Sequence, residues 1–115
     1  MTTTLSTHVL DTALGAPAAG IHVTLWRVGA GGDATAVSSS VTNDDGRVGS
    51  LAPTAGVLVA GAYRLCFDVA PYFAAARRES FYNEICIDFV IAADAQHYHV
   101  PLLLSPYGYS TYRGS

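Results

Sequence analysis

Four histidines, at positions 8, 22, 97 and 99, are the side chains of this 115-residue chain best suited to proton transfer near neutral pH. His97 and His99 stand two residues apart, so on a β-strand both rings point to the same side. That spacing could also serve zinc, but no third ligand and no cysteine pair stands beside it. An isolated histidine more often has a structural or solvated role, and His22 has no supporting context. We predict no metal site.

Arg47 and the end of the chain also carry groups that could act on a ligand. Arg47 follows the turn Asn43–Gly46 at the start of an expected strand, where a fixed guanidinium could hold an oxyanion or a planar carbonyl. The alternative is a surface arginine paired with Asp44 or Asp45. Chain ends are usually frayed, but the last four residues combine a tyrosine, an arginine and two small residues directly after an expected strand. Such a chain end could fold against a binding site.

Cys66 and Cys86 each alternate with presumed core residues, so both are expected to face away from the core in strand interiors. Carboxylates at Asp68 and Asp88, two residues further on, disfavour a reactive thiolate. Two cysteines are too few for a disulfide scaffold and lack the spacing of a metal site. We expect two reduced, inert thiols, with a cross-strand disulfide as the open alternative.

Composition limits the class of protein. With 50% hydrophobic and 13% charged residues, residues 1–115 are expected to form one folded domain with a real core. There is no long apolar run typical of a transmembrane helix, and the N-terminus lacks the basic and apolar regions of a secretory signal, so we expect a cytoplasmic protein. The net charge is −3 and no basic stripe is present, which argues against nucleic-acid or membrane-surface binding.

The elements that must position these residues are mostly short strands, because apolar residues alternate and Gly, Pro, Asn and Asp cluster between the runs. One segment, Pro71–Arg78, favours a short helix instead, since proline suits a first turn and alanines continue it. The prediction is an all-β, two-sheet sandwich with one helix. The expected strands span 5–12, 21–28, 34–42, 47–51, 62–69, 81–90, 97–104 and 107–113.

Strand alternation indicates which side chains share a surface. His97 and His99 share a face with Pro101 and Leu103, while the residues between them, such as Tyr98, are expected to face the core. In the first strand, one face carries Ser6, His8 and Leu10. In the last strand, Gly108, Ser110 and Tyr112 fall together. Each of these faces mixes polar groups with apolar or aromatic carbon, as a binding surface does.

Taken together, the motifs are more specific than any one of them. The opening LSTHVLDTALGAPAAGIHVTL, the turn TNDDGR and the ending HYHVPLLLSPYGYSTYRGS closely resemble the 5-hydroxyisourate hydrolases, also called transthyretin-related proteins. GAYRLCFDVAPYFAA and SFYNEICIDFVI resemble the strand–helix–strand segment of that family. The resemblance runs from Leu5 to Ser115, and the terminal YRGS separates these hydrolases from transthyretin itself, the hormone carrier of the same fold.

The resemblance implies a transthyretin-like sandwich that forms a homotetramer, a dimer of dimers, with active sites in the channel between dimers. It implies hydrolysis of 5-hydroxyisourate to 2-oxo-4-hydroxy-4-carboxy-5-ureidoimidazoline in urate breakdown, without a cofactor or metal. On that basis His8, Arg47 and His99 are the catalytic residues, and His97 stands at the rim. The same three, with the terminal tetrapeptide, would bind the substrate; the tetrapeptide is Tyr112, Arg113, Gly114 and Ser115.

Two other functions stay open. A transthyretin-type carrier of a small hydrophobic ligand would keep the fold and channel but would not need the histidines, Arg47 and YRGS together. A structural, immunoglobulin-like interaction domain would have no reason to gather these groups on one surface. The sequence does not decide whether His8 or His99 is the general base.

Overall fold

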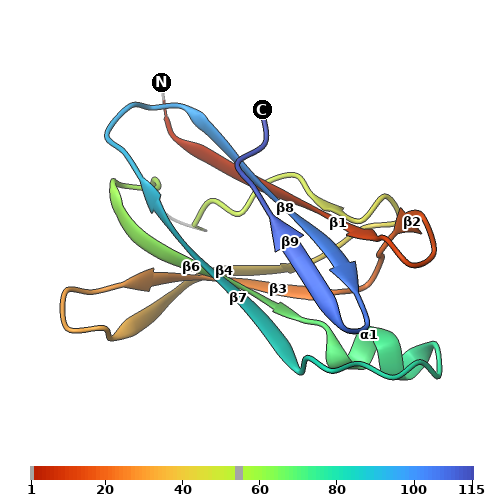
Figure 1. Ribbon diagram of the computed structural model, residues 1–115. Coiled ribbons are helices and arrows are strands. Elements are labelled where there is room, and N and C mark those ends of the chain that lie inside the picture. Colours follow the sequence, from red (N-terminus) through yellow and green to blue (C-terminus); the bar gives the residue numbers. More distant parts are fainter. Residues whose placement is uncertain (1, 54–55) are drawn as a thin grey trace.

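The computed structural model describes residues 2–53 and 56–115 and contains two β-sheets that pack face to face (Figure 1). The first sheet has the order β2-β1-β8-β9, with β5 also paired to β1; the second has the order β4-β3-β6-β7. The strands of the first sheet are β1 (Thr4–Asp11), β2 (Ala16–Pro17), β5 (Arg47–Val48), β8 (His97–Ser105) and β9 (Gly108–Thr111). Those of the second are β3 (His22–Val28), β4 (Ala34–Val41), β6 (Gly61–Asp68) and β7 (Glu84–Ile91).

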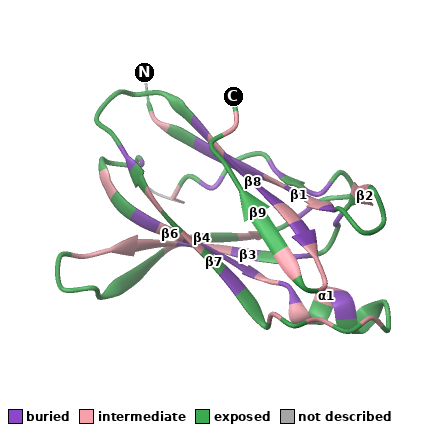
Figure 2. Cartoon of the chain, viewed as in Figure 1, coloured by how far each residue is buried: buried purple, intermediate pink, exposed green. Residues whose placement is uncertain are grey.

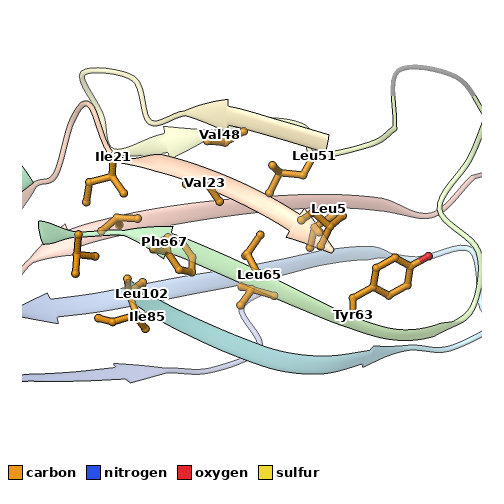
Figure 3. Packing of buried hydrophobic residues seen from close by; sticks show 14 of the residues in the cluster. Leu5, Ile21, Val23, Val48, Leu51, Tyr63, Leu65, Phe67, Ile85 and Leu102 are labelled. Carbon is orange, nitrogen blue, oxygen red and sulfur yellow. The ribbon is translucent and has the colours of Figure 1, made fainter. Parts of the chain in front are cut away.

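The core lies between the two sheets and is filled by alternate residues of the central strands (Figure 3). Leu5 and Val9 of β1 and Leu102 of β8 point inward from one sheet, while Leu65 and Phe67 of β6 point inward from the other, and all five are fully buried. This is the alternation read from the sequence, so the all-β sandwich prediction is confirmed. The buried bands run along the strand interiors, whereas β9 is mostly exposed (Figure 2).

The single helix of the described residues, α1 (Ala70–Ala75), closes one end of the sandwich (Figure 1). Proline in the first turn starts it, and Phe73 buries its ring in the core. The helix and the segment after it are both fixed to the end of β1. Tyr72 of the helix donates to the fully buried carboxylate of Asp11 at 2.8 Å, and Arg78 beyond the helix donates to it at 2.6 Å. Burial alone would raise the pKa of Asp11, but these hydrogen bonds outweigh it and hold that pKa below its usual value.

Several element boundaries differ from the expected ones by two residues or more. The helix expected over Pro71–Arg78 ends at Ala75, and the strand expected over 107–113 covers only Gly108–Thr111. The strand expected over 47–51 contains only Arg47–Val48, and the strand expected over 81–90 begins at Glu84. A two-residue strand, Ala16–Pro17, pairs with β1 inside a segment expected to be a turn. Short edge strands are set by what lies beside them rather than by their own pattern, so periodicity could not find their limits.

Cys66 and Cys86 lie directly opposite each other on β6 and β7 and form a disulfide. Both stand on the outer face of the second sheet, beside Trp26 and Arg64, as alternation predicted. The expectation of two reduced thiols is wrong for this structure. The reason is the strand register, which aligns the two residues and which neither cysteine's local sequence specifies. Among the described residues, no helix is long and apolar enough to cross a membrane.

Candidate active site

The candidate site lies on the outer face of the first sheet, where β1 and β8 run parallel. The register pairs Thr4 with His97, Ser6 with His99, His8 with Pro101 and Leu10 with Leu103. Because the two strands are parallel and side chains alternate, these eight residues stand in two rows on one face. The polar pairs come first and the apolar pair lies at the far end. The expectation that the histidines of the two strands share a surface is confirmed.

His99 is held through both its ring and its backbone. Its Nδ1 is hydrogen-bonded to the Ser6 hydroxyl at 2.8 Å, and its backbone carbonyl accepts a hydrogen bond from the Gly114 amide at 2.8 Å. The side chain is half-buried, and the pKa of His99 is held below 6.5 by that burial and then by the charges of Arg47, His8 and His97. The imidazole is therefore neutral at pH 7, the form that can accept a proton.

Arg47 and His8 are directly opposite each other, because β5 pairs with β1 in the register His8 to Arg47. The preceding turn fixes Arg47: the Asn43 side-chain oxygen accepts from the Arg47 amide at 2.9 Å. Gly46 in that turn has φ +74° and approaches β1 so closely that a Cβ would lie 2.4 Å from the Val9 carbonyl oxygen. The turn thus delivers the exposed guanidinium to the histidine face, and the alternative of a surface ion pair with Asp44 or Asp45 is not formed among the described residues.

The His8 ring has its Nε2 2.9 Å from the Asp45 carbonyl oxygen. A carbonyl oxygen only accepts, so Nε2 of His8 carries a proton and donates it there. In contrast, Nε2 of His99 has no hydrogen-bond partner in the described part of the chain. The two rings therefore differ in their hydrogen bonding. His8 is oriented by a loop carbonyl, whereas one ring nitrogen of His99 can still bind a ligand or water.

The end of the chain folds back onto His99 and is not frayed. Gly114 forms an isolated bridge with His99, and a Cβ on Gly114 would lie 2.6 Å from the Cδ2 atom of the imidazole. Only glycine therefore fits between the tail and the ring. Ser115 is exposed and its hydroxyl makes no hydrogen bond within the described residues, and Tyr112 is 57% exposed. Of the tetrapeptide, it is Gly114 that touches the histidine.

Arg113 does not join the histidines. Its guanidinium stacks on the ring of Tyr98 at 4.3 Å and donates to the Gln96 side chain at 3.0 Å. Tyr98 faces the core side of β8, opposite to His97 and His99. An apolar recess of about 350 Å³ opens on that side too, between β7 and the C-terminal segment, and it is lined in part by Ile87, Phe89 and Tyr112. It is separate from the histidine face.

His97 is exposed, whereas His99 is half-buried, as the rim position predicted. The structure adds a contact that the sequence analysis missed: Ser6 joins the two rings, with its hydroxyl 2.9 Å from Nε2 of His97. Alternation had placed Ser6 on the same face as His8. Only the pairing of β1 with β8 brings it between the histidines.

A two-sheet sandwich with a histidine and arginine cluster on an outer face, closed by its own C-terminus, defines a small class of proteins. The chain belongs to the HIUase/Transthyretin family, whose model matches residues 5–114. A protein of Deinococcus radiodurans named 5-hydroxyisourate hydrolase is 47% identical, over 96% of this chain and 95% of that one.

Solved structures agree with this assignment. The 5-hydroxyisourate hydrolase of Klebsiella pneumoniae has a TM-score of 0.81 and 44% identity, covering 98% of this chain and 94% of that one. Sea bream transthyretin in complex with thyroxine has a TM-score of 0.87 at 28% identity, covering 96% and 93%. The fold is therefore transthyretin-like, and the hydrolase is the nearer of these two in sequence.

Proposed function

We propose that this protein is an enzyme that hydrolyses 5-hydroxyisourate to 2-oxo-4-hydroxy-4-carboxy-5-ureidoimidazoline in purine catabolism. The names of the Deinococcus and Klebsiella relatives support this substrate. The observation that carries the proposal in this chain is the convergence of His8, Arg47 and His99 on one face, with Gly114 packed against the His99 ring. A base and a fixed cation side by side are what hydrolysis of a cyclic amide requires.

In the proposed reaction His99 is the general base. Its Nε2 takes a proton from a water molecule, which attacks a ring carbonyl of the substrate. The amide C–N bond then breaks, the leaving nitrogen takes up the proton held by His99, and the carboxylic acid formed releases its own proton to solvent as it ionises. Ser6 occupies Nδ1 and the lowered pKa keeps the ring neutral, so Nε2 is ready to accept. His8, held by the Asp45 carbonyl, orients the substrate.

Arg47 stabilises the negative charge that develops on the attacked carbonyl oxygen, because a guanidinium presents two parallel donors to an oxyanion. The terminal residues complete the substrate pocket. Ser115 contacts the substrate and Gly114 positions His99. Tyr112 lines the recess on the other side of β8, so it helps bind the substrate through its main chain. Arg113 contributes through its main chain, since its side chain is engaged with Tyr98. No step needs a cofactor or a metal.

We also propose that residues 1–115 form one domain that assembles as a homotetramer, a dimer of dimers, with the sites between dimers. The histidine face supports this, because it continues into the half-buried Leu10 and Leu103 on either side of the buried Pro101, and partly exposed apolar side chains next to a polar site favour burial by a second copy. Two facing copies would also close the site to water, which strengthens its electrostatic interactions.

We propose the cytoplasm as the place of action, where a soluble metabolite is available. The Cys66–Cys86 disulfide is the observation that argues for an oxidising compartment instead. Cell fractionation decides between them: recovery of the protein with markers of an oxidising compartment would overturn the cytoplasmic assignment.

A second function, transport of a small hydrophobic ligand, is favoured by the similarity to transthyretin. It differs from the hydrolase in what it requires of the site. A carrier needs an apolar channel but no base, so substitution of His99 would leave ligand binding largely intact, whereas the hydrolase would lose turnover.

The test is an absorbance assay with freshly generated 5-hydroxyisourate. We expect the protein to accelerate its decay, and His99→Asn to lower kcat by ~10²–10⁴-fold, the usual loss for a general base. His22→Asn is the matched control: it removes an exposed histidine of the other sheet and should not change turnover. If the wild-type protein does not change the decay rate, the enzyme assignment is wrong.

A further inference from the structure

Four side chains on the histidine face form one continuous hydrogen-bonded row. Thr4 Oγ1 lies 2.5 Å from Nδ1 of His97, Nε2 of His97 lies 2.9 Å from Ser6 Oγ, and Ser6 Oγ lies 2.8 Å from Nδ1 of His99. The row begins at two exposed residues, Thr4 and His97, passes through the 9% exposed Ser6 and ends at the half-buried His99. It therefore connects the solvent to the ring that faces the site.

The number of protons on Ser6 limits how the row can be arranged. A hydroxyl has one hydrogen, so Ser6 donates to one ring nitrogen and accepts from the other. If it donates to Nε2 of His97, it accepts from Nδ1–H of His99, and Nε2 of His99 is then unprotonated. If it donates to His99 instead, Nε2 of His99 carries the proton. The orientation of one hydroxyl thus sets the tautomers of both rings together.

We propose that Ser6 is a positioning and proton-relay residue, which holds His99 as a base at Nε2 and conducts its proton through His97 to solvent. The inference rests on the proposed hydrolysis. As Nε2 of His99 takes a proton from water, Nδ1 of His99 passes its proton to Ser6 Oγ, Ser6 passes its own to Nε2 of His97, and Nδ1 of His97 releases one at Thr4. The same path in reverse supplies the proton that His99 then gives to the leaving nitrogen.

The surroundings of His99 favour transfer of its proton to another group. A proton that stayed on His99 would make the ring cationic, half-buried and close to Arg47, an arrangement that burial and like charge both disfavour. His97 is exposed and solvated, so it carries a transient positive charge at lower cost. The relay therefore moves the charge away from Arg47 and leaves the guanidinium free for the developing oxyanion.

The parallel register explains why the row exists in this fold. Thr4 pairs with His97 and Ser6 pairs with His99, so hydroxyl and imidazole side chains interleave across the two strands. The row occupies the outer face of the sheet, and the core packing on the inner face does not depend on it. Substitution of Ser6 can therefore be interpreted as a change to the site.

The first arm of the test is kinetic. We expect Ser6→Ala to lower kcat by ~10-fold or more with KM within ~3-fold, because it disturbs the base and not substrate binding. Ser6→Thr keeps the hydroxyl and should recover kcat to within ~3-fold. His97→Asn breaks the path beyond Ser6 but leaves the Ser6–His99 hydrogen bond, so kcat should fall measurably but by less than ~10-fold, and an unchanged kcat would contradict conduction through His97. Ser105→Ala, which removes the hydroxyl that bonds the Gly108 carbonyl elsewhere on β8, is the control with unchanged turnover.

The second arm does not depend on turnover. Nitrogen-15 NMR of the imidazole rings reports which nitrogen carries the proton. We expect Ser6→Ala to change the tautomer signals of both His97 and His99, and Ser6→Thr to restore them. If Ser6→Ala turns over like Ser105→Ala, or if the ring signals are unaffected, the relay is wrong. Lack of turnover by the wild-type protein overturns the hydrolase proposal instead, and the NMR arm still shows whether Ser6 couples the rings.

Discussion

At the scale of single residues, Gly114 packs against the ring of His99 with no room for a side chain. Gly114→Ala would put a Cβ 2.6 Å from Cδ2 of that ring, so either the imidazole or the tail must move. We expect kcat to fall by ~10²-fold, the effect of misplacing a catalytic group by about 1 Å. Steady-state kinetics checks this against Gly108→Ala, where the nearest atom is 3.6 Å away and activity should persist.

Arg47 allows a test of geometry at constant charge. Arg47→Lys keeps the positive charge but loses the planar pair of donors. If Arg47 holds the oxyanion, turnover should fall at least ~10²-fold, the usual effect of removing one fixed donor from such a site. Near-normal kcat in Arg47→Lys would assign Arg47 to the solvated surface.

The lowered pKa of His99 predicts how activity depends on pH. Only the neutral ring accepts a proton, so kcat/KM should stay high at neutral pH and decline only at pH values below 6.5, as His99 becomes protonated. The groups facing it are Arg47, His8 and His97, whose positive charges disfavour that protonation. NMR titration measures the effect directly: Arg47→Gln should raise the midpoint of His99, and a lower or unchanged midpoint would contradict the assignment.

The sequence predicted which residues share the site face but not how they bond. Side chains alternate strictly along a strand, so Ser6 with His8, and His97 with His99, could be assigned to common faces from spacing alone. The Ser6–His99 hydrogen bond joins residues 93 positions apart and depends on strand pairing. Arg113 lies beyond the end of β9 at Thr111, where alternation no longer applies, and its side chain turned to the other side of β8.

At the scale of elements, the Cys66–Cys86 disulfide is the main covalent constraint on the second sheet. It links β6 and β7 across α1, with a sequence separation of 20. Closing a loop of that length removes unfolded-state entropy worth about 3 kcal/mol in the chain-entropy model. We expect the double variant Cys66→Ala, Cys86→Ala to lose about 2–4 kcal/mol of unfolding free energy in urea under oxidising conditions.

The control for this prediction is the wild-type protein in dithiothreitol, which should then resemble the double variant. Equal stability of oxidised wild type and double variant would contradict the role given to the disulfide. The second sheet lies away from the histidines, so turnover at temperatures below unfolding should be unchanged in all three samples.

The long strands with alternating buried residues were predictable from the sequence pattern, and the two-residue strands were not. β3, β6 and β8 each contain several fully buried residues at alternate positions, and their bounds agree with the expected ranges to within one residue. β2 and β5 have two residues each, too few to show a periodic pattern, and they are strands because they pair with β1. The proline and alanines that predicted the helix acted locally, in a way that does not depend on the rest of the fold.

At the scale of the whole molecule, the fold follows from the need to bury the apolar face of each sheet. Two amphipathic sheets must cover each other, and the helix covers one open end. Asp11 breaks this pattern with a charged group: it stands at a core position of β1, and it is tolerated because Arg78 and Tyr72 satisfy it. A carboxylate at a core position is a signal that a cationic partner must exist, although the sequence does not say which one.

The proposed assembly is tested at this same scale by Leu103→Glu. Leu103 stands beside Leu10 on the histidine face, and burying a carboxylate there against a second copy is costly without a partner. We expect light scattering to give about four times the 12.0 kDa chain mass for the wild type and a smaller mass for Leu103→Glu, with turnover lost in parallel. Val41→Glu is the matched control: Val41 is 52% exposed on β4 of the other sheet, so mass and activity should be unchanged. A monomeric wild type with full activity, or a Leu103→Glu variant that keeps both mass and turnover, would show that the site is complete within one chain and that the histidine face is not an interface.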